Sequence, residues 1–379
     1  MIMANNNNKD KCNVPHLRFP EFTGEWKMAT FGDIAKGFDY GMNAAAKSFD
    51  GNNKYIRITD IDEVSSQYLY DDVVSPDGEL EDRYLVKEND ILLARTGAST
   101  GKSYLYRNSD GKLYFAGFLI RANIYKHNSY FVFSQLHTLR YKKWISVMSA
   151  RSGQPGINSQ EYASFPVYTT SLQEEDKIAT FLKLLDERII TQNKIIEKYE
   201  SLIKGIAQNV ARNNKPNIRL SECLECSSST LQESDVCENG TYPVYGANGI
   251  VGYLDNYNAE KEAVYIIKDG SGVGTVSYVT GKCSATGTLN TLQAKEGYSL
   301  QYLYYMLKVF NFEPYKTGMA IPHIYFKDYG KAKIFCPSYT EQLKYVGVLS
   351  TIDNKLSAEQ SILTDLSLQK QYLLHQMFI

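Results

Sequence analysis

SLQEEDKIATFLKLLD, residues Ser171–Asp186, returns later in the chain as SYTEQLKYVGVLSTID, residues Ser338–Asp353. The segments lie 167 residues apart, and five of their sixteen positions are identical: Ser171/Ser338, Glu174/Glu341, Lys177/Lys344, Leu182/Leu349 and Asp186/Asp353. The same offset continues upstream, where it aligns Pro155/Pro322, Ile157/Ile324 and Tyr162/Tyr329. A repeat at fixed spacing marks a duplicated structural unit. The sequence therefore predicts one unit that is built twice.

Each copy continues as a helical pattern whose apolar residues recur at steps of three and four. The first helix is expected at Leu172–Arg212, about 60 Å long at 1.5 Å per residue. The second is expected to start after Pro337 and to end with the chain. Such long heptad seams favour mutual packing of the two helices. The alternative is two amphipathic helices that cover separate cores. The predicted pairing residues are Ile178, Leu182, Leu185, Ile189, Gln192 and Ile196 in the first helix, and Leu349, Ile352, Leu356, Glu359 and Leu363 in the second.

The two remaining regions have strand-like segments such as NDILLART and EAVYIIKDG, separated by turn sequences. Shorter helices are expected at Tyr130–Ser149 and Ser299–Phe310. Each region therefore reads as an α+β domain followed by a long helix. The two regions also resemble each other, because each places a strand before a Gly-x-x-x-Gly loop, at Gly97/Gly101 and at Gly270/Gly274.

Bulk composition sets broad limits on the function. The chain has 379 residues, which suggests two or three domains, and a net charge of −1, which favours no class of partner. We expect a soluble cytoplasmic protein, because the sequence shows no signal peptide and no apolar run of membrane-spanning length. Six scattered cysteines favour reduced thiols; a zinc site at Cys223 and Cys226 is the alternative.

The sequence contains only incomplete versions of known nucleotide-binding and catalytic motifs. GASTGKS, Gly97–Ser103, has three residues between its glycines where a phosphate-binding P-loop has four, and the second copy, GSGVGTV, has no lysine. NFEPY, Asn311–Tyr315, lacks the first proline of the amino-methyltransferase loop. The five histidines form no catalytic set.

In contrast, Ile91–Ser109 and Arg140–Gln160 contain several basic residues, of which Arg140, Lys142 and Lys143 lie close together, and the second segment ends in a polar run. Such segments suit contacts to phosphates and base edges, although a solvated basic face has the same composition.

The whole chain resembles the specificity subunit of type I restriction-modification systems. The resemblance rests on NVPHLRFPEFTGEW (Asn13–Trp26), on YPVYGANGIVGYLDNY (Tyr242–Tyr257) with KDGSGVGTVSYVTGKCSATGTLN (Lys268–Asn290), and on the starts of the two repeated helices. The implied order is an N-terminal tail at 1–14, a target-recognition domain at 15–168, a spacer helix at 169–212, a second domain at 213–335 and a second helix at 336–379. The implied fold pairs the helices as an antiparallel coiled coil with pseudo-two-fold symmetry.

The resemblance implies a non-catalytic protein that reads a bipartite target in double-stranded DNA, with one domain for each half-site. Its implied partners are two DNA methyltransferase subunits docked on the helices, together with restriction and translocase subunits. S-adenosylmethionine, ATP and magnesium would bind those partners, and no cofactor or metal is expected on this chain. A coiled-coil interaction protein without DNA specificity, or an enzyme with an unrecognised site, is the alternative.

Side chains in each of the two domains are predicted to contact DNA. Long polar and basic side chains can reach phosphates or base edges, but a surface residue without a ligand has the same appearance in a sequence. The candidates are Arg95, Lys102, Arg151, Gln154 and Asn158 in the first domain, and Lys268, Ser271, His323 and Tyr325 in the second.

Overall fold

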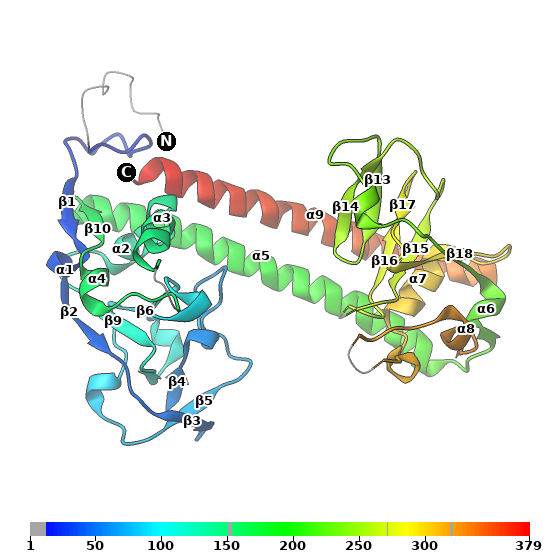
Figure 1. Ribbon diagram of the computed structural model, residues 1–379, viewed down its shortest axis with the longest axis horizontal. Helices are drawn as coiled ribbons and strands as arrows, with labels where there is room; N and C mark the ends of the chain where they lie inside the picture. The colour runs from blue at the N-terminus through cyan, green and yellow to red at the C-terminus, as the bar shows by residue number, and fades with distance from the viewer. Residues whose placement is uncertain (1–12, 151–153, 271, 319–320) are drawn as a thin grey trace. The chain divides into compact units, whose positions relative to one another are not determined.

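The computed structural model describes residues 13–150, 154–270, 272–318 and 321–379 (Figure 1). It divides into two compact units. The first runs up to Gln192 and also includes Ile362–Ile379, and the second is Asn193–Ser361. Each of the two long helices, α5 (Leu172–Asn213) and α9 (Tyr339–Met377), contributes one part to each unit. The predicted Arg151 and Ser271, and most of the N-terminal tail, lie outside the described residues.

The first unit is built around a four-stranded antiparallel sheet in the order β2-β9-β6-β7. The strand β6 is buried at every position, because it lies between two cores. Successive side chains of a strand point to opposite faces: Ile91 and Leu93 join one core, and Leu92 and Ala94 join the other. The strands are β2 (Ala35–Tyr40), β6 (Asp90–Ala94), β7 (Ser103–Leu105) and β9 (Leu119–Ile124).

Smaller elements complete this unit. The pairs β1-β10 and β3-β5 are antiparallel, and β4-β8 is parallel. These strands are β1 (Lys27–Thr30), β3 (Ala45–Ser48), β4 (Lys54–Ile56), β5 (Val74–Asp77), β8 (Leu113–Phe115) and β10 (Pro166–Thr169). The short helices are α1 (Phe31–Ile34), α2 (Ser129–Gln135), α3 (Leu139–Met148) and α4 (Ser159–Ala163).

The second unit repeats this plan. Its four-stranded antiparallel sheet has the order β12-β18-β15-β16, with β12 (Leu224–Ser228), β15 (Ala263–Ile267), β16 (Val276–Val279) and β18 (Leu289–Ala294). A short antiparallel pair, β11-β19, again joins the two ends of the domain, and a parallel pair, β13-β17, corresponds to β4-β8. The remaining elements are β11 (Ile218–Arg219), β13 (Tyr242–Gly246), β14 (Gly249–Leu254), β17 (Ser284–Ala285), β19 (Lys333–Ile334), α6 (Leu220–Cys223), α7 (Leu300–Lys308) and α8 (Phe326–Tyr329). The predicted duplicated α+β architecture is confirmed.

The helical structure expected at Tyr130–Ser149 is divided between two helices, α2 and α3. Thr138 interrupts the helical path with an extended backbone, and its hydroxyl accepts a hydrogen bond from Tyr141 N at 3.3 Å. Threonine is a favoured N-cap residue because its hydroxyl satisfies a free N–H of the first turn. The chain therefore ends one helix and starts another within a continuous apolar pattern.

In the first unit, the last part of α9 packs antiparallel on the first part of α5. Lys370 pairs with Asp186 at 2.6 Å, and Leu374 lies beside Leu182, so positions that advance along α5 go back along α9. The end of α9 also enters the domain core, where Phe378 contacts the ring of Trp26. Every predicted seam residue on the two helices is buried or half-buried. Which residue faces which along the full seam stays a prediction.

The segment before β1 contacts both long helices in the first unit. Leu17 N donates to Gln376 O at 2.8 Å. Arg18 forms a buried ion pair with Glu174 at 2.7 Å, and Trp26 Nε1 donates to the same carboxylate at 3.3 Å. Within residues 13–150, 154–270, 272–318 and 321–379, no helix has the length and apolar character needed to cross a membrane.

Candidate nucleic-acid interface

The Gly-x-x-x-Gly loop of the first unit meets the segment that precedes α4. Gly97 N donates to Pro155 O at 2.9 Å, and Ile157 N donates to Arg95 O at 2.9 Å. Ile157 is buried and anchors its segment in the domain core. The fold therefore brings the two sequence regions with candidate DNA contacts, near Arg95 and near Gln154, to one surface.

The second unit makes the same junction from the repeat-equivalent residues. Gly270 N donates to Pro322 O, and Ile324 N donates to Lys268 O, each at 3.0 Å. Ile324 is as buried as its counterpart in the first unit. The aligned proline and isoleucine thus hold the same loop in both domains, and Lys268 occupies the place of Arg95.

Both loops are tight turns held by their own backbone. The four glycines have positive φ values between 74° and 96°, which other L-residues rarely adopt: Gly97, Gly101, Gly270 and Gly274. Gly101 N donates to Ala94 O, and Lys102 N donates to Ser99 O. A P-loop presents such N–H groups to a phosphate, whereas here these two groups bond within the protein. The turn that the sequence predicted is observed.

Arg95 has a buried side-chain donor that makes no hydrogen bond within the described residues. This donor is its Nε atom. The guanidinium lies 5.0 Å from the ring centre of Tyr40, at cation–π distance. Tyr40 is half-exposed, and its hydroxyl accepts a hydrogen bond from Ser159 N at 3.2 Å. That bond, with a smaller contribution from the charge of Arg95, lowers the pKa of Tyr40.

The other candidates of the first unit have different surroundings. Lys102 is mostly buried and pairs with the exposed Glu63 at 2.8 Å. Gln154 is exposed beside the loop. Asn158 caps α4: its side-chain oxygen accepts from Glu161 N at 2.9 Å, and Glu161 accepts from Asn158 N in return. Asn158 thus has a structural role, and a DNA contact from it stays a prediction.

In the second unit, the candidates lie on the same two segments. Lys268 is half-buried and donates to Ser228 Oγ at 3.4 Å, which is a long hydrogen bond. His323 pairs through its backbone with Thr317, and its ring centre lies 5.9 Å from that of Tyr325. Tyr325 is 47% exposed, so its ring is accessible to a ligand. Lys268, His323 and Tyr325 therefore border one surface.

Two exposed aromatic residues at this surface were missed from the sequence. Tyr40 lies under Arg95, and Phe118, 60% exposed, accepts a hydrogen bond from Arg95 N through its carbonyl oxygen at 3.1 Å. Aromatic faces are common stacking surfaces for bases and cations. Phe118 directly follows Gly117, and the matching Gly287 precedes Thr288, whose carbonyl receives the corresponding bond from Lys268. The pair Gly117 and Gly287 was the sequence signal that could have located this part of the surface.

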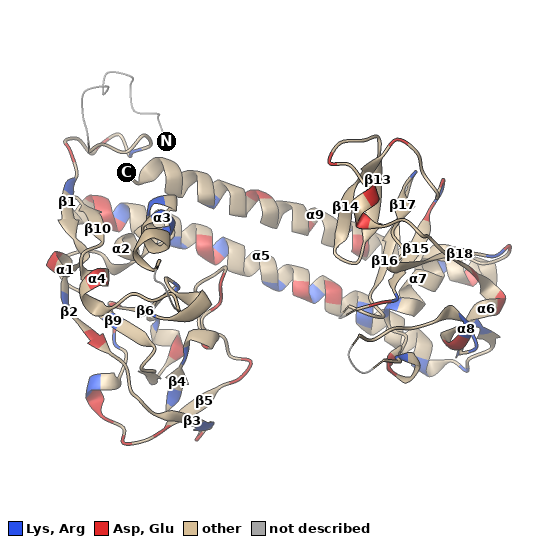
Figure 2. Cartoon of the chain, in the orientation of Figure 1, with Lys and Arg blue, Asp and Glu red and all other residues tan. Residues whose placement is uncertain are grey.

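The basic segment Arg140–Gln160 is less uniform than its sequence indicates. Arg140 turns inward: its guanidinium lies 4.6 Å from the ring centre of Tyr168 and 5.4 Å from that of Phe165, and burial lowers its pKa. Lys142 and Lys143 on the same helix are exposed. The reading of Arg140 as part of a basic surface is therefore corrected. Along α5, acidic and basic residues are interspersed (Figure 2), so that helix is not a uniformly basic surface.

The five cysteines at described positions do not gather into a metal centre. Burial raises the pKa of the Cys223 thiol to about 12 and that of Cys226 to about 11, so both remain protonated near neutral pH. In the part of the chain that the structure describes, no three His, Cys, Asp or Glu side chains could together hold a metal ion. NFEPY is a short turn in which Asn311 Oδ1 accepts from Glu313 N at 3.0 Å.

The protein therefore contains two copies of one α+β domain. Each copy has a glycine loop held by backbone hydrogen bonds and a polar surface beside it, as expected of a protein with two similar binding domains. The family model for the type I restriction modification DNA specificity domain matches residues 23–201 and 216–367, and the chain belongs to this family.

The individual proteins that resemble this chain have low sequence identity to it. The specificity subunit of the type I restriction enzyme EcoprrI from Escherichia coli is 27% identical over 116 residues, which cover 31% of this chain and 29% of that protein. The alignment therefore spans less than a third of the relative. The crystal structure of the S subunit of a type I restriction-modification system from M. genitalium matches 97% of this chain and 99% of its own, with a TM-score of 0.66 and 18% identity. A chain from a study of complex assembly in a type I system covers 94% of this chain and 98% of its own, with a TM-score of 0.50 and 15% identity. These structures share the fold.

Proposed function

We propose that this chain is the DNA-reading subunit of a type I restriction-modification complex and that each globular domain reads one half-site of a bipartite target. The observation that carries the proposal is the duplicated loop junction. The backbones of Arg95 and Lys268 occupy equivalent places, but the Arg95 side chain lies on the Tyr40 ring, whereas the Lys268 side chain donates to Ser228 Oγ. A shared scaffold with different surface residues suits two readers of different sequences, because base-edge readout depends on side chains.

The loop side chains supply the DNA contacts in this proposal. Arg95 and Lys268 reach base edges or phosphates, and the exposed aromatic rings of Tyr40, Phe118 and Tyr325 offer stacking surfaces. Gln154 and His323 lie on the adjoining segments. Arg151 and Ser271, which lie outside the described residues, and Lys102 and Asn158 remain candidates of the same proposal.

The chain itself is proposed to be non-catalytic. Two methyltransferase subunits dock on the paired helices α5 and α9 and supply S-adenosylmethionine and adenine methylation. A restriction and translocase subunit supplies ATP and magnesium chemistry. Partners that add phosphate contacts fit the near-neutral charge of this chain, since phosphate contacts provide much of the affinity for DNA. The complex is proposed to act in the cytoplasm. The proposed domain junctions lie near residues 168, 212 and 335.

The test is selection of bound duplexes from a random pool by the purified chain together with its methyltransferase subunits. We expect enrichment of two short specific sequences that flank a spacer of arbitrary bases. Enrichment of one continuous site would contradict the bipartite proposal. Binding without any enriched sequence would favour an interaction protein. Turnover of S-adenosylmethionine by this chain without its partners would show that it is an enzyme.

A further inference from the structure

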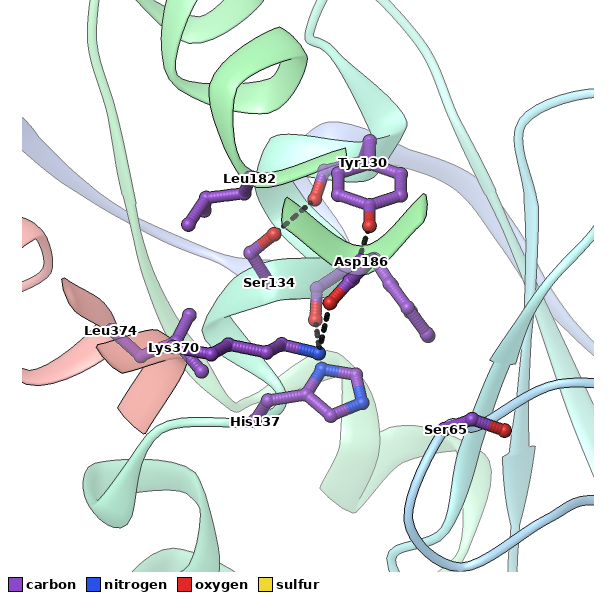
Figure 3. Close-up of a pocket in the computed structure, with 9 residues that line it drawn as sticks. Ser65, Tyr130, Ser134, His137, Leu182, Asp186, Lys370 and Leu374 are labelled. Carbon is purple, nitrogen blue, oxygen red and sulfur yellow. Dashed lines mark hydrogen bonds and ion pairs between the residues drawn. The ribbon is translucent and has the colours of Figure 1, made fainter. Parts of the chain in front are cut away.

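The aspartate that is identical in both repeats accepts a hydrogen bond from a tyrosine hydroxyl in both units, although the two tyrosines lie at different turns of their helices. Tyr130 of α2 donates its hydroxyl hydrogen bond to Asp186 Oδ2 on α5 (Figure 3). In the second unit, Tyr305 of α7 donates to Asp353 Oδ2 on α9 at 3.2 Å. Both tyrosines lie on the first helix after the four-stranded sheet. The repeated aspartate therefore receives a hydroxyl from the globular domain in each unit.

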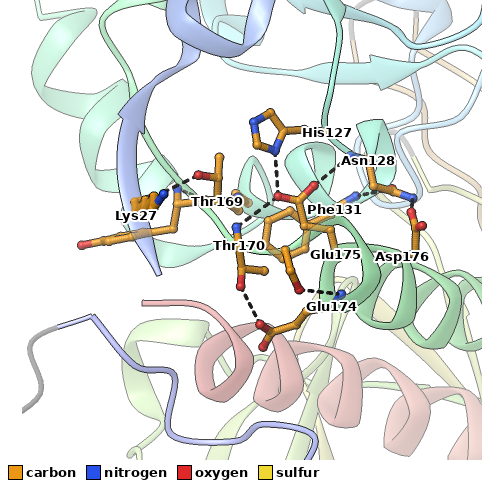
Figure 4. A network of polar contacts seen from close by, with 12 residues as sticks. Lys27, His127, Asn128, Phe131, Thr169, Thr170, Glu174, Glu175 and Asp176 are labelled. Atoms are coloured by element: carbon orange, nitrogen blue, oxygen red, sulfur yellow. Dashed lines mark hydrogen bonds and ion pairs between the residues drawn. The ribbon is translucent and has the colours of Figure 1, made fainter. Parts of the chain in front are cut away.

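A second contact holds the start of the same domain helix. Glu175 Oε2 accepts a hydrogen bond from Asn128 N, the N-cap of α2, at 2.9 Å (Figure 4). Gln342, the repeat counterpart of Glu175, accepts from Ser299 N, the N-cap of α7, at 2.8 Å. Glu175 and Gln342 are almost completely buried. The acceptor changes from glutamate to glutamine, but the contact is kept.

The two contacts are equally spaced in both units. Eleven residues separate the two acceptors on α5 (186 − 175) and on α9 (353 − 342). This spacing is about three helical turns, or roughly 16 Å at 1.5 Å per residue. One contact can allow a domain to swing about a point. Two contacts to residues about three turns apart on one helix restrain the angle between domain and helix, in addition to the apolar packing of Ile178 and Leu182 in the core of the first domain.

The tyrosine hydroxyls remain donors at any physiological pH, because burial and the neighbouring carboxylates raise the pKa of Tyr130 and of Tyr305. The two junctions differ in one respect. Asp186 also pairs with Lys370, whereas the residue that corresponds to Lys370 in the repeat is the buried Ile203. The contact in the second unit therefore lacks this additional ion pair, and Tyr305 offers the simpler test.

We propose that Tyr130–Asp186 and Tyr305–Asp353 are positioning contacts that hold each recognition domain at one angle on its long helix, and thereby restrict the protein to one spacer length between half-sites. The proposal rests on the bipartite reading proposed above. A base-pair step moves a half-site by about 3.4 Å along the DNA and turns it by about 35°. A domain that swings on its helix could meet such a displaced half-site, and a domain fixed at two contacts could not.

The test compares Tyr130→Phe, Tyr305→Phe and the double variant with the parent in the methyltransferase complex. Each substitution removes one hydroxyl and keeps the ring. The control is Tyr104→Phe, which removes a similar bond to Asp110 inside the first domain, away from α5 and α9. Duplexes with the parental half-sites and spacers one base pair shorter, equal or longer are competed for binding. Methylated sites are then mapped in a host that carries each complex.

We expect Tyr305→Phe and Tyr130→Phe to lower the preference for the parental spacer by about tenfold, the factor that loss of one hydrogen bond of about 1.4 kcal/mol gives. Both half-sites should stay the same, and Tyr104→Phe should keep the single spacer. Asp353→Asn retains an acceptor for Tyr305 and should also keep it. Variants that are folded, as measured by thermal unfolding, and retain full spacer preference would overturn the proposal. A parent complex without any bipartite preference would overturn the proposed function instead.

Discussion

Arg95 and Lys268 are the side chains whose removal most directly tests DNA reading at the residue scale. Because they occupy equivalent places in separate domains, Arg95→Ala should weaken discrimination at one half-site only, and Lys268→Ala at the other. A lost base contact costs about 1–3 kcal/mol of discrimination. The measurement is competition binding with duplexes that are altered in one half-site at a time. Lys36→Ala, an exposed cation on β2, is the control. Equal loss at both half-sites would contradict separate reading.

His137 makes a second prediction at this scale, through pH. Its ring nitrogens have two polar neighbours: Nε2 lies 3.0 Å from Ser66 Oγ, and Nδ1 lies 3.0 Å from Phe133 O. Burial, and then the charge of Lys370, lowers the pKa of His137 to about 4, while the hydrogen bond to Phe133 O and the charge of Asp186 oppose the shift. The unfolded chain binds a proton near pH 6.5, and the folded chain does so only near pH 4. Stability should therefore fall as pH decreases across this window.

Replacement of the His137 ring tests how much it contributes to the pH dependence of stability. His137→Gln should show a shallower loss of unfolding free energy between pH 6.5 and pH 4 than the parent, as measured by chemical denaturation at several pH values. Ser66→Ala is the matched control, because it removes the hydrogen-bond partner and leaves the titrating ring. Parallel curves for His137→Gln and the parent would show that another group causes the dependence.

At the scale of elements, the glycine loop gives a prediction about ATP. The loop bonds its own N–H groups, and Lys102 pairs with Glu63, so neither supplies a nucleotide site. Lys102→Ala should leave ATP hydrolysis of the full restriction complex unchanged per DNA-bound complex, although DNA affinity can decrease. Hydrolysis measured at saturating DNA checks this. A loss of hydrolysis that excess DNA does not restore would favour a nucleotide site at the loop.

Elements also show what the sequence could and could not predict. The heptad patterns and the 167-residue offset indicated the long helices and the duplicated domain, because periodicity and repetition are properties of the sequence itself. The break at Thr138 was missed because the apolar pattern continues across it, and only the capping geometry divides α2 from α3. Arg140 turns inward onto Tyr168, which composition cannot reveal. Tyr40 reaches the site through sheet pairing rather than through any local motif.

For the whole molecule, we propose that the long helices set the distance between the two readers. Four helix-forming residues inserted after Gln192 in α5, together with four inserted after Ser361 in α9, where each helix passes from one unit to the other, add about 6 Å and about 40° of rotation at 1.5 Å per residue and 3.6 residues per turn. The spacer of methylated sites should then lengthen by one or two base pairs with unchanged half-sites, since DNA rises about 3.4 Å per base pair. Unchanged spacers in methylation maps of the insertion variant would contradict this role.

The central claim is that two separate domains each read one half-site, and an exchange of one domain tests it most directly. Residues 15–168 are replaced by the equivalent region of a related chain, and α5, α9 and the second domain are kept. Methylated sites are then mapped in a host that carries the complex. The account predicts a new sequence at one half-site, the parental sequence at the other and an unchanged spacer. A change in both half-sites, or in neither, would contradict it.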